Sequence, residues 1–194
     1  MLKSEQFATY AHLQTFSVSA GTTPGGIRVR GRELIQALNS GLTTLVFGAN
    51  NTNAAVSLPL TPVSFPRLTS YVNLYEFYVF HRAKAIFQSN QPTTAGGVSM
   101  LAVDYDVKDA VPSSSVGMMR NISSSMSNIY ADNACVISKS LSRLPRYCTS
   151  QATSTDSAQL NQANVLYAFE GVTGVNAAQG YLVIEYDVEF FTPQ

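Results

Sequence analysis

The clearest pattern of apolar and polar positions lies near the end of the chain, over residues 180–192. Two sets of side chains alternate there, one apolar and one mostly acidic: Leu182, Ile184, Tyr186, Val188 and Phe190, against Val183, Glu185, Asp187, Glu189 and Phe191. Neighbouring side chains of a strand point to opposite faces, and a period of two is typical of a half-buried antiparallel strand. We therefore expect a strand here, with the apolar set turned toward a core.

Several other segments carry shorter or less regular strand patterns. Residues 27–35 begin with strict alternation, and residues 75–88 form a long run rich in Tyr, Phe, Val and Ile. Such β-branched and aromatic residues favour extended structure. The remaining strand candidates are residues 42–47, 98–103, 134–138, 147–152 and 165–172.

Turn-forming residues separate these candidates. Residues 50–66 and 89–97 are rich in Asn, Pro, Ser or Gly, and we expect mainly loops there. A short helix is expected at 65–71, with Pro66 in its first turn, and another within the otherwise loop-like stretch 112–128. Roughly eight short strands with few helices predict an all-β fold, an eight-stranded antiparallel jelly-roll sandwich.

The composition changes the expected surface. The chain has 194 residues, of which 45% are hydrophobic and only 12% are charged, about half the usual charged fraction. This length fits one domain, expected over 27–194 after an N-terminal arm at 1–26. So little charge predicts a surface that other chains cover, or one rich in neutral polar residues. The formal net charge is zero, which argues against nucleic-acid binding through bulk charge.

Several functional classes find no support in the sequence. Cys135 and Cys148 are too few for a disulfide scaffold and are expected to be free thiols in a reducing compartment. No Cys/His cluster has zinc-site spacing, no signal peptide is evident, and no apolar run approaches the ~20 residues that span a bilayer. We therefore expect no membrane partner.

Catalytic motifs are absent as well. The sequence has no Gly-x-Ser-x-Gly, Walker A or Gly-x-Gly-x-x-Gly motif, and neither histidine lies near a nucleophile motif. We expect no enzyme. One aromatic group could be read as a base-stacking platform, but few basic residues are interleaved with it, so core and interface packing explains it better. Its members are Tyr71, Tyr75, Phe77, Tyr78 and Phe80.

Three carboxylates are crowded at the end of the apolar run 98–103. They belong to Asp104, Asp106 and Asp109, and their mutual repulsion would be relieved by a hard cation such as calcium. An EF-hand would have Gly at its sixth position and Glu at its twelfth, where this chain has Asp109 and Ser115. Three carboxylates also supply fewer than the 6–8 oxygens that calcium takes. Either a neighbouring chain completes the site, or the segment is a solvated turn with capping aspartates.

Five segments, taken together in this order, resemble a known family. They are residues 26–34 (GIRVRGREL), 65–68 (FPRL) with 75–78 (YEFY), 92–98 (PTTAGGV), 104–109 (DYDVKD) and 180–190 (GYLVIEYDVEF). This succession resembles the shell domain of tombusvirus-like and sobemovirus-like coat proteins over residues 26–194. The resemblance implies a jelly roll that self-assembles into an icosahedral shell around single-stranded genomic RNA, in a virion assembled in the host cytoplasm.

The resemblance also assigns candidate residues. It implies calcium between neighbouring subunits, held by Asp104, Asp106 and Asp109 with extra ligands from the adjacent chain. By their spacing, Asp132 and Gln151 could be these ligands, and the C-terminal carboxylate of Gln194 is another candidate. Many relatives carry a long basic N-terminal arm, whereas this chain has only Lys3 before Arg28. Some relatives have a protruding C-terminal domain, and this chain fits the shell-only plan.

A basic strand follows the expected arm. Arg28, Arg30 and Arg32 are two residues apart, so that their guanidinium groups share one face, and near the junction of arm and shell they could contact RNA phosphates. The alternatives are a solvated face with Glu33 as a partner, or a salt bridge between subunits. For the whole protein, the rival function is a calcium-dependent, lectin-like β-sandwich that binds carbohydrate, and a β-sandwich hydrolase is disfavoured.

Overall fold

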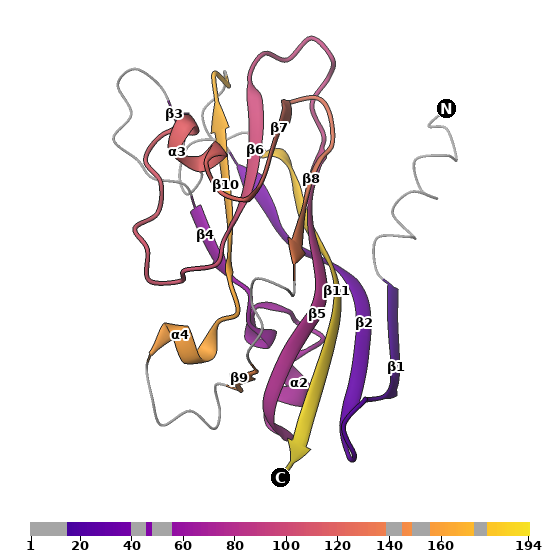
Figure 1. Ribbon diagram of the computed structural model, residues 1–194. Coiled ribbons are helices and arrows are strands. Elements are labelled where there is room, and N and C mark those ends of the chain that lie inside the picture. Colours follow the sequence, from indigo (N-terminus) through magenta and orange to yellow (C-terminus); the bar gives the residue numbers. More distant parts are fainter. Residues whose placement is uncertain (1–14, 40–45, 48–55, 139–144, 149–155, 173–177) are drawn as a thin grey trace, which may run out of the picture.

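Two antiparallel sheets face each other in the computed structural model, which describes residues 15–39, 46–47, 56–138, 145–148, 156–172 and 178–194 (Figure 1). The first sheet has six strands in these residues. Its path is β1 (Thr15–Ala20), β2 (Ile27–Asn39), β11 (Ala178–Pro193), β5 (Tyr75–Ser89) and β8 (Asn133–Ser138), and the short β9 (Arg146–Tyr147) pairs with β5. Strands from the two ends of the chain therefore lie side by side in this sheet.

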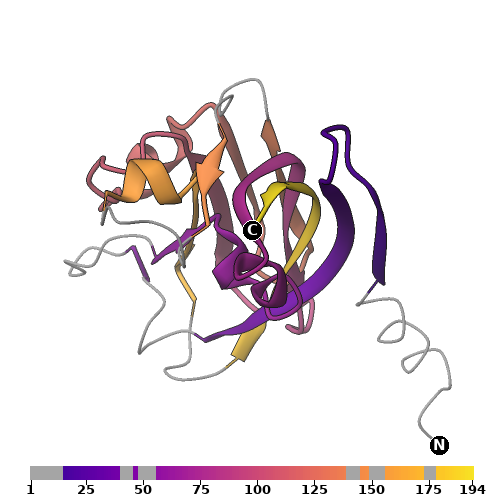
Figure 2. The ribbon, with the colours of Figure 1, turned by 90° about the horizontal axis from the view of Figure 1, so that it is seen from below.

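The second sheet has five strands in the described residues. Its path is β3 (Val46–Phe47), β10 (Asn164–Glu170), β6 (Val98–Asp104) and β7 (Ser123–Asn128), and β4 (Val56–Pro59) pairs with β10. Its pairs are antiparallel except for β3 with β10. Figures 1 and 2 both place β1 on the flank of the molecule, beyond β2 and away from this sheet.

The core lies between the two sheets and is built from their alternating apolar faces. The six-stranded sheet contributes Phe87, whose ring centroid lies 5.5 Å from that of Phe169 of β10 in an edge-to-face contact. The segment between β4 and β5 closes one end with Phe65, Leu68 and Val72, all buried. Burial of such side chains is the main force that holds the two layers together.

The alternation of β11 is confirmed on its apolar side. All five residues of that set are buried, because β11 lies between β2 and β5 at the centre of the six-stranded sheet. The other face differs from the expectation of a mostly solvated acidic surface, since Val183 and Glu189 are also buried. On this face, hydrogen bonds with Thr22, Thr23 and His81 cover the Glu189 carboxylate, which the acidic sequence does not indicate.

Most strand predictions are confirmed, and three loop or helix predictions need correction. Residues 123–128 form β7, although their polar sequence Ser-Ser-Ser-Met-Ser-Asn shows no strand pattern, because backbone hydrogen bonds to β6 do not depend on side chains. Val56–Pro59 likewise forms β4 inside the expected loop 50–66. The helix expected at 65–71 is α2 (Thr69–Val72), preceded by the 3-10 turn η1 (Pro62–Ser64).

Two more short helices connect the strands. The helix expected within 112–128 is α3 (Ser115–Met119), where the Ser114 hydroxyl caps the helix by accepting a hydrogen bond from the Gly117 N–H at 3.1 Å. The last helix is α4 (Ser157–Leu160). None of the helices described is long and apolar enough to cross a membrane.

The expected arm is partly described. Its residues 15–20 form β1, paired with β2 from Thr15 opposite Arg32 to Ala20 opposite Ile27. A turn at 21–26 joins the two strands, where the Gly21 N–H donates to the Gly26 carbonyl at 2.9 Å. All six side chains of β1 are exposed, so this edge strand is held by its backbone more than by burial.

Candidate functional sites

The acidic loop begins where β6 ends. Asp104 is the last residue of that strand, and its Oδ1 accepts a hydrogen bond from the Asp106 N–H at 3.0 Å. Asp106 in turn accepts from the Lys108 N–H at 3.1 Å through Oδ1, and from the Asp109 N–H at 3.0 Å through its carbonyl. These bonds make a compact turn, in which Asp104 interacts electrostatically with both Asp106 and Asp109.

The charges of this loop are poorly compensated. The pKa of Asp104 is raised, mainly by burial and further by repulsion from Asp109 and Asp106, although a hydrogen bond from the Asp106 N–H opposes the shift. Lys108 is in the loop, but its Nζ lies 3.2 Å from an oxygen of Asp156, beyond the cluster. Over the described ranges, no group of three or more His, Cys, Asp or Glu side chains is placed to hold a metal by itself.

The other predicted donors lie elsewhere. Asp132 lies between β7 and β8, and its Oδ1 accepts from the Ser89 N–H at 2.9 Å. The register of β6 with β7 pairs Val98 with Asn128, so that Asp132 is near the opposite end of β6 from Asp104. Within one subunit these two aspartates do not meet. Gln151 falls outside the described residues, and at Gln194 the backbone N–H donates to the Leu74 carbonyl at 3.2 Å.

The three arginines of β2 face the acidic side of β11. The strand register places Arg28, Arg30 and Arg32 opposite Glu189, Asp187 and Glu185 respectively. Arg28 binds Asp187 with two hydrogen bonds, Nε to Oδ1 at 2.5 Å and Nη2 to Oδ2 at 2.7 Å. Nε of Arg30 lies 3.0 Å from Oδ2 of Asp187, and Nη1 of Arg32 lies 3.7 Å from Oε1 of Glu185.

These contacts correct the expectation that Glu33 is a partner of the arginines. Glu33 is buried on the opposite face of β2, where it accepts hydrogen bonds from the Tyr186 hydroxyl and from the Arg67 N–H. Asp187 is the partner of Arg28 and Arg30, and Glu185 is the partner of Arg32. The pKa of Asp187 is lowered, because hydrogen bonds and charge from Arg28 and Arg30 outweigh the effect of burial. Consecutive strand residues cannot share a face, which is why Glu33 points away from Arg32.

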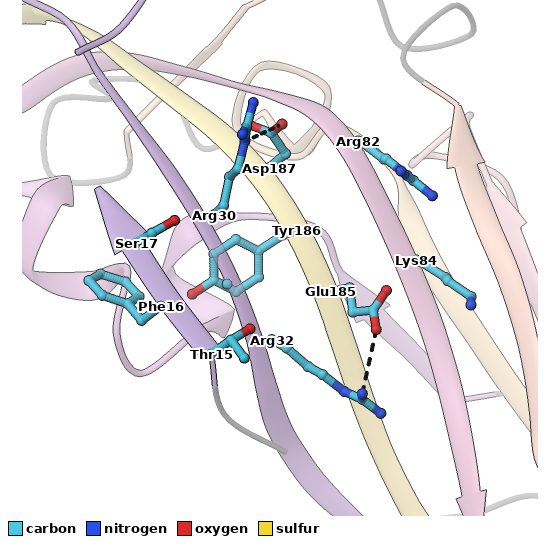
Figure 3. A pocket seen from close by; sticks show the side chains of 11 residues that line it. Thr15, Phe16, Ser17, Arg30, Arg32, Arg82, Lys84, Glu185, Tyr186 and Asp187 are labelled. Atoms are coloured by element: carbon cyan, nitrogen blue, oxygen red, sulfur yellow. Dashed lines mark hydrogen bonds and ion pairs between the residues drawn. The ribbon is translucent and has the colours of Figure 1, made fainter. Parts of the chain in front are cut away.

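On the other side of β11, strand β5 adds two more cations. The register pairs Asp187 with Arg82 and Glu185 with Lys84. Each of these two carboxylates therefore has a basic residue on both neighbouring strands. Figure 3 shows the dashed contacts to the β2 arginines, while Arg82 and Lys84 stand apart on the other side of β11.

A groove of about 730 Å³ lies over these strands. Gly31 and Tyr186 contribute to its lining from the middle of the sheet, and Phe16 belongs to β1 on one side (Figure 3). We call this cavity the basic groove, and its lining residues are Thr15, Phe16, Ser17, Arg30, Gly31, Arg32, Arg82, Lys84, Glu185, Tyr186 and Asp187.

A buried carboxylate beside this face was missed by sequence reasoning. Glu189 accepts hydrogen bonds from the N–H of Thr22 at 2.5 Å, the hydroxyl of Thr22 at 2.7 Å and the N–H of Thr23 at 3.0 Å. Nε2 of His81 lies 2.6 Å from its other oxygen. Glu189 thus ties the β1–β2 turn to β5. As an acidic residue on the polar side of an alternating strand, Glu189 was expected to be exposed to solvent. Nothing in the neighbouring sequence indicates that Thr22, Thr23 and His81 contact it.

The aromatic group is confirmed as packing. Tyr78 and Phe80 are buried, and the Phe77 ring stacks on Phe191 with centroids 5.7 Å apart. Tyr71 and Tyr75 pack against Phe190. These five rings are engaged with one another and with β11, so that they offer no open row of faces on which bases could stack.

The cysteines provide no nucleophile. Cys135 and Cys148 are both free, as the sequence predicted, and both are buried. Burial raises the pKa of each thiol to about 12, so that both are protonated near neutral pH.

Comparisons with known proteins identify the family. A family model described as Viral coat protein (S domain) matches residues 13–194. No curated protein matches the chain. Among solved structures, Melon necrotic spot virus is similar with a TM-score of 0.74 and 21% identity, over 93% of this chain and 53% of the other, so this chain spans about half of that one.

Two further structures match over most of both chains. Tobacco necrosis virus has a TM-score of 0.74 and 18% identity over 93% of this chain and 87% of the other. Mud crab tombus-like virus has a TM-score of 0.72 and 18% identity over 93% and 91%. These likenesses confirm the jelly-roll fold, and nothing among them supports a lectin-like module. Because the family model matches residues 13–194, the chain belongs to the viral coat protein (S domain) family, which implies a structural, non-enzymatic role.

Proposed function

We propose that this protein assembles with copies of itself into an icosahedral shell that encloses single-stranded RNA, with calcium ions bridging neighbouring subunits. The observation that carries the proposal is the match of a coat-protein family model to residues 13–194 of a jelly-roll chain. The protein would then be a component of the virion, assembled in the host cytoplasm. Closed symmetry buries the same surface patches on every copy.

The exposed apolar side chains support self-assembly. Ile122 is 81% exposed and Val116 is 64% exposed, and both lie close to α3 and β7. Others are spread over the molecule: Phe16, Val18, Val63, Leu74, Met126, Tyr130, Val136 and Tyr147. With only 12% charged residues, a monomer would leave this apolar surface in water. Contacts between copies would remove it.

Calcium fits the acidic loop as one half of a site. The loop offers hard oxygen donors from Asp104, Asp106 and Asp109, and the raised pKa of Asp104 reflects, besides burial, charge that a cation would relieve. Asp132 and Gln151 of a neighbouring subunit would supply further oxygens. When bound, calcium would offset repulsion between carboxylates of two chains. Its removal above the carboxylate pKa values would leave that repulsion across the interface.

The β2 arginines are the proposed RNA contacts. Their exposure and their ion pairs differ, so they are not equally available to a phosphate. Two hydrogen bonds to Asp187 engage Arg28, whose side chain is only 25% exposed. Arg30 is 60% exposed and is the best placed of the three to meet a phosphate. Because cations that bind phosphates release counterions from the RNA, retention of RNA is expected to fall as salt rises.

Negative-stain microscopy of the purified protein tests the assembly, with and without a chelator at neutral to mildly alkaline pH. We expect megadalton particles that swell or loosen in chelator and become sensitive to nuclease, while mild acid partly replaces the metal. A small, soluble species under all conditions would contradict the shell. If particles form but their size and nuclease resistance do not change in chelator, only the calcium bridges would be contradicted.

A further inference from the structure

Strand β1 presents an open edge of backbone hydrogen-bonding groups. Among the described residues it pairs with β2 alone, and Figures 1 and 2 show it on the flank of the molecule, beyond β2. The Gly21 N–H donates to the Gly26 carbonyl, and hydrogen-bonded pairs alternate along an antiparallel ladder. The N–H and C=O groups of Phe16, Val18 and Ala20 therefore point away from β2, where no described residue bonds them.

This edge lacks the features that usually keep strand edges from pairing. Edge strands of soluble proteins are commonly protected by charged side chains, by Pro or by a bulge. β1 has the sequence TFSVSA, and its register with β2 is unbroken. At β7, an edge strand of the second sheet, the Ser125 carbonyl accepts a hydrogen bond from Nδ2 of Asn133 at 3.1 Å, so that the chain occupies part of that edge itself. The edge of β1 is open to a further strand.

The turn beside β1 holds this edge in a fixed position. The Glu189 carboxylate accepts hydrogen bonds from the Thr22 and Thr23 N–H groups. Gly21 makes room for this contact, because a Cβ at Gly21 would lie 2.9 Å from Oε1 of Glu189 and 2.8 Å from the backbone carbon of Gly26. A strand that is already extended and anchored loses less conformational entropy when a partner binds.

We propose that β1 pairs with β1 of a second copy across a two-fold axis, in the antiparallel register that sets Val18 opposite Val18 of the partner subunit. The same register sets Phe16 opposite Ala20 of the partner subunit and, by symmetry, Ala20 opposite the partner's Phe16. Every outward backbone group then has a partner, with two hydrogen bonds at each of the three pairs. The inference rests on the proposed function, since it names one contact by which copies would assemble.

The side chains of β1 favour a copy of the chain as the occupant. Phe16 is 40% exposed and Val18 is 48% exposed, and both lie on the same face of the strand as Ala20. Two-fold pairing continues this apolar face from one copy to the next and sets the large Phe16 ring opposite a small methyl group. No charged side chain of 15–20 would meet its own copy.

The size of the contact indicates when it forms. Stable interfaces bury roughly 1,200 Å² or more, and a pair of six-residue strands is too small to reach that area alone. The contact should therefore form within the assembled shell, where other contacts between copies support it, and should be absent from the dissociated chain.

Crosslinking of the full-length protein during assembly tests the register. With a thiol crosslinker matched to a Cβ separation of about 5 Å, Val18→Cys should give covalent dimers on a denaturing gel. Phe16→Cys is the matched control, because its two copies would lie four residues apart, or about 13 Å, and should stay monomeric. Phe16→Cys/Ala20→Cys should restore the dimer. Wild type controls for Cys135 and Cys148, which are buried.

Hydrogen exchange of the wild-type protein tests the edge without a substitution. The amides of Phe16, Val18 and Ala20 should exchange rapidly in the dissociated chain and more slowly in particles, by about tenfold or more. The amides of Ser17 and Ser19 face β2 and serve as the internal reference, since they should be protected in both states.

The outcomes separate this contact from assembly itself. Slow exchange of the outward amides already in the dissociated chain would mean that another part of the same chain covers the edge, and it would overturn the proposal. Rapid exchange in particles would overturn it as well, as would particles in which Val18→Cys forms no dimer or crosslinks no better than Phe16→Cys. If wild-type protein forms no particles, the proposed function itself fails.

Discussion

Replacing Glu189 with Gln should destabilise the fold strongly at neutral pH. The side chain of Glu189 is only 3% exposed in the folded chain. Burial alone would raise its pKa, but hydrogen bonds from Thr22, His81 and the Thr23 N–H outweigh it and lower the pKa from 4.5 to about 2. Since one pKa unit corresponds to about 1.4 kcal/mol, this difference corresponds to about 3 kcal/mol of stability.

The sign of the pH dependence follows from the depressed pKa. The contribution of Glu189 is fully present above its unfolded pKa of about 4.5 and is lost as pH falls toward the folded value of about 2. Wild type should therefore exceed Glu189→Gln by about 3 kcal/mol at pH 7. The gap between the two proteins should close between roughly pH 4.5 and pH 2.

Urea denaturation of the dissociated full-length chain measures this gap. Tyrosine fluorescence can follow it, because the chain has 10 Tyr and no Trp. Glu185→Gln is the matched control on the same strand: its carboxylate is 40% exposed and lies 3.7 Å from Arg32, so the change should cost no more than about 1 kcal/mol. A gap between wild type and Glu189→Gln that stays constant from pH 7 to pH 2 would refute the reasoning.

Three further changes probe the core, the assembly and the metal. Phe87→Ala, which removes the contact with Phe169 between the sheets, should lower the free energy of unfolding by about 3 to 5 kcal/mol in urea titrations. Ile122→Asp should abolish particles in microscopy while circular dichroism stays unchanged, because Ile122 is 81% exposed in the single chain; normal particles would exclude it from an interface. Asp106→Asn/Asp109→Asn should make particle size insensitive to chelator, as measured by light scattering, and continued swelling would argue against these ligands.

The strand framework could be predicted because its signal is local. The alternation over 182–190 identifies β11, since burial on one face requires a period of two. The long run 75–88 identifies β5 because it is rich in β-branched and aromatic residues. Strands without that signal were missed. β7 has the sequence SSSMSN and is held in the sheet by backbone pairing with β6, which side-chain patterning does not report.

The sequence by itself determined which residues carry charge, that the segments with an apolar strand pattern are extended, and to which family the chain is similar. Only the tertiary structure decided which charges meet. Arg28 binds Asp187, 159 positions away, whereas Glu33 turns into the core. The register between β2 and β11 sets these contacts, and a shift of one residue would turn every side chain to the other face. The burial of Glu189 and the position of Arg82 and Lys84 across β11 from the arginines likewise depend on the pairing of distant strands.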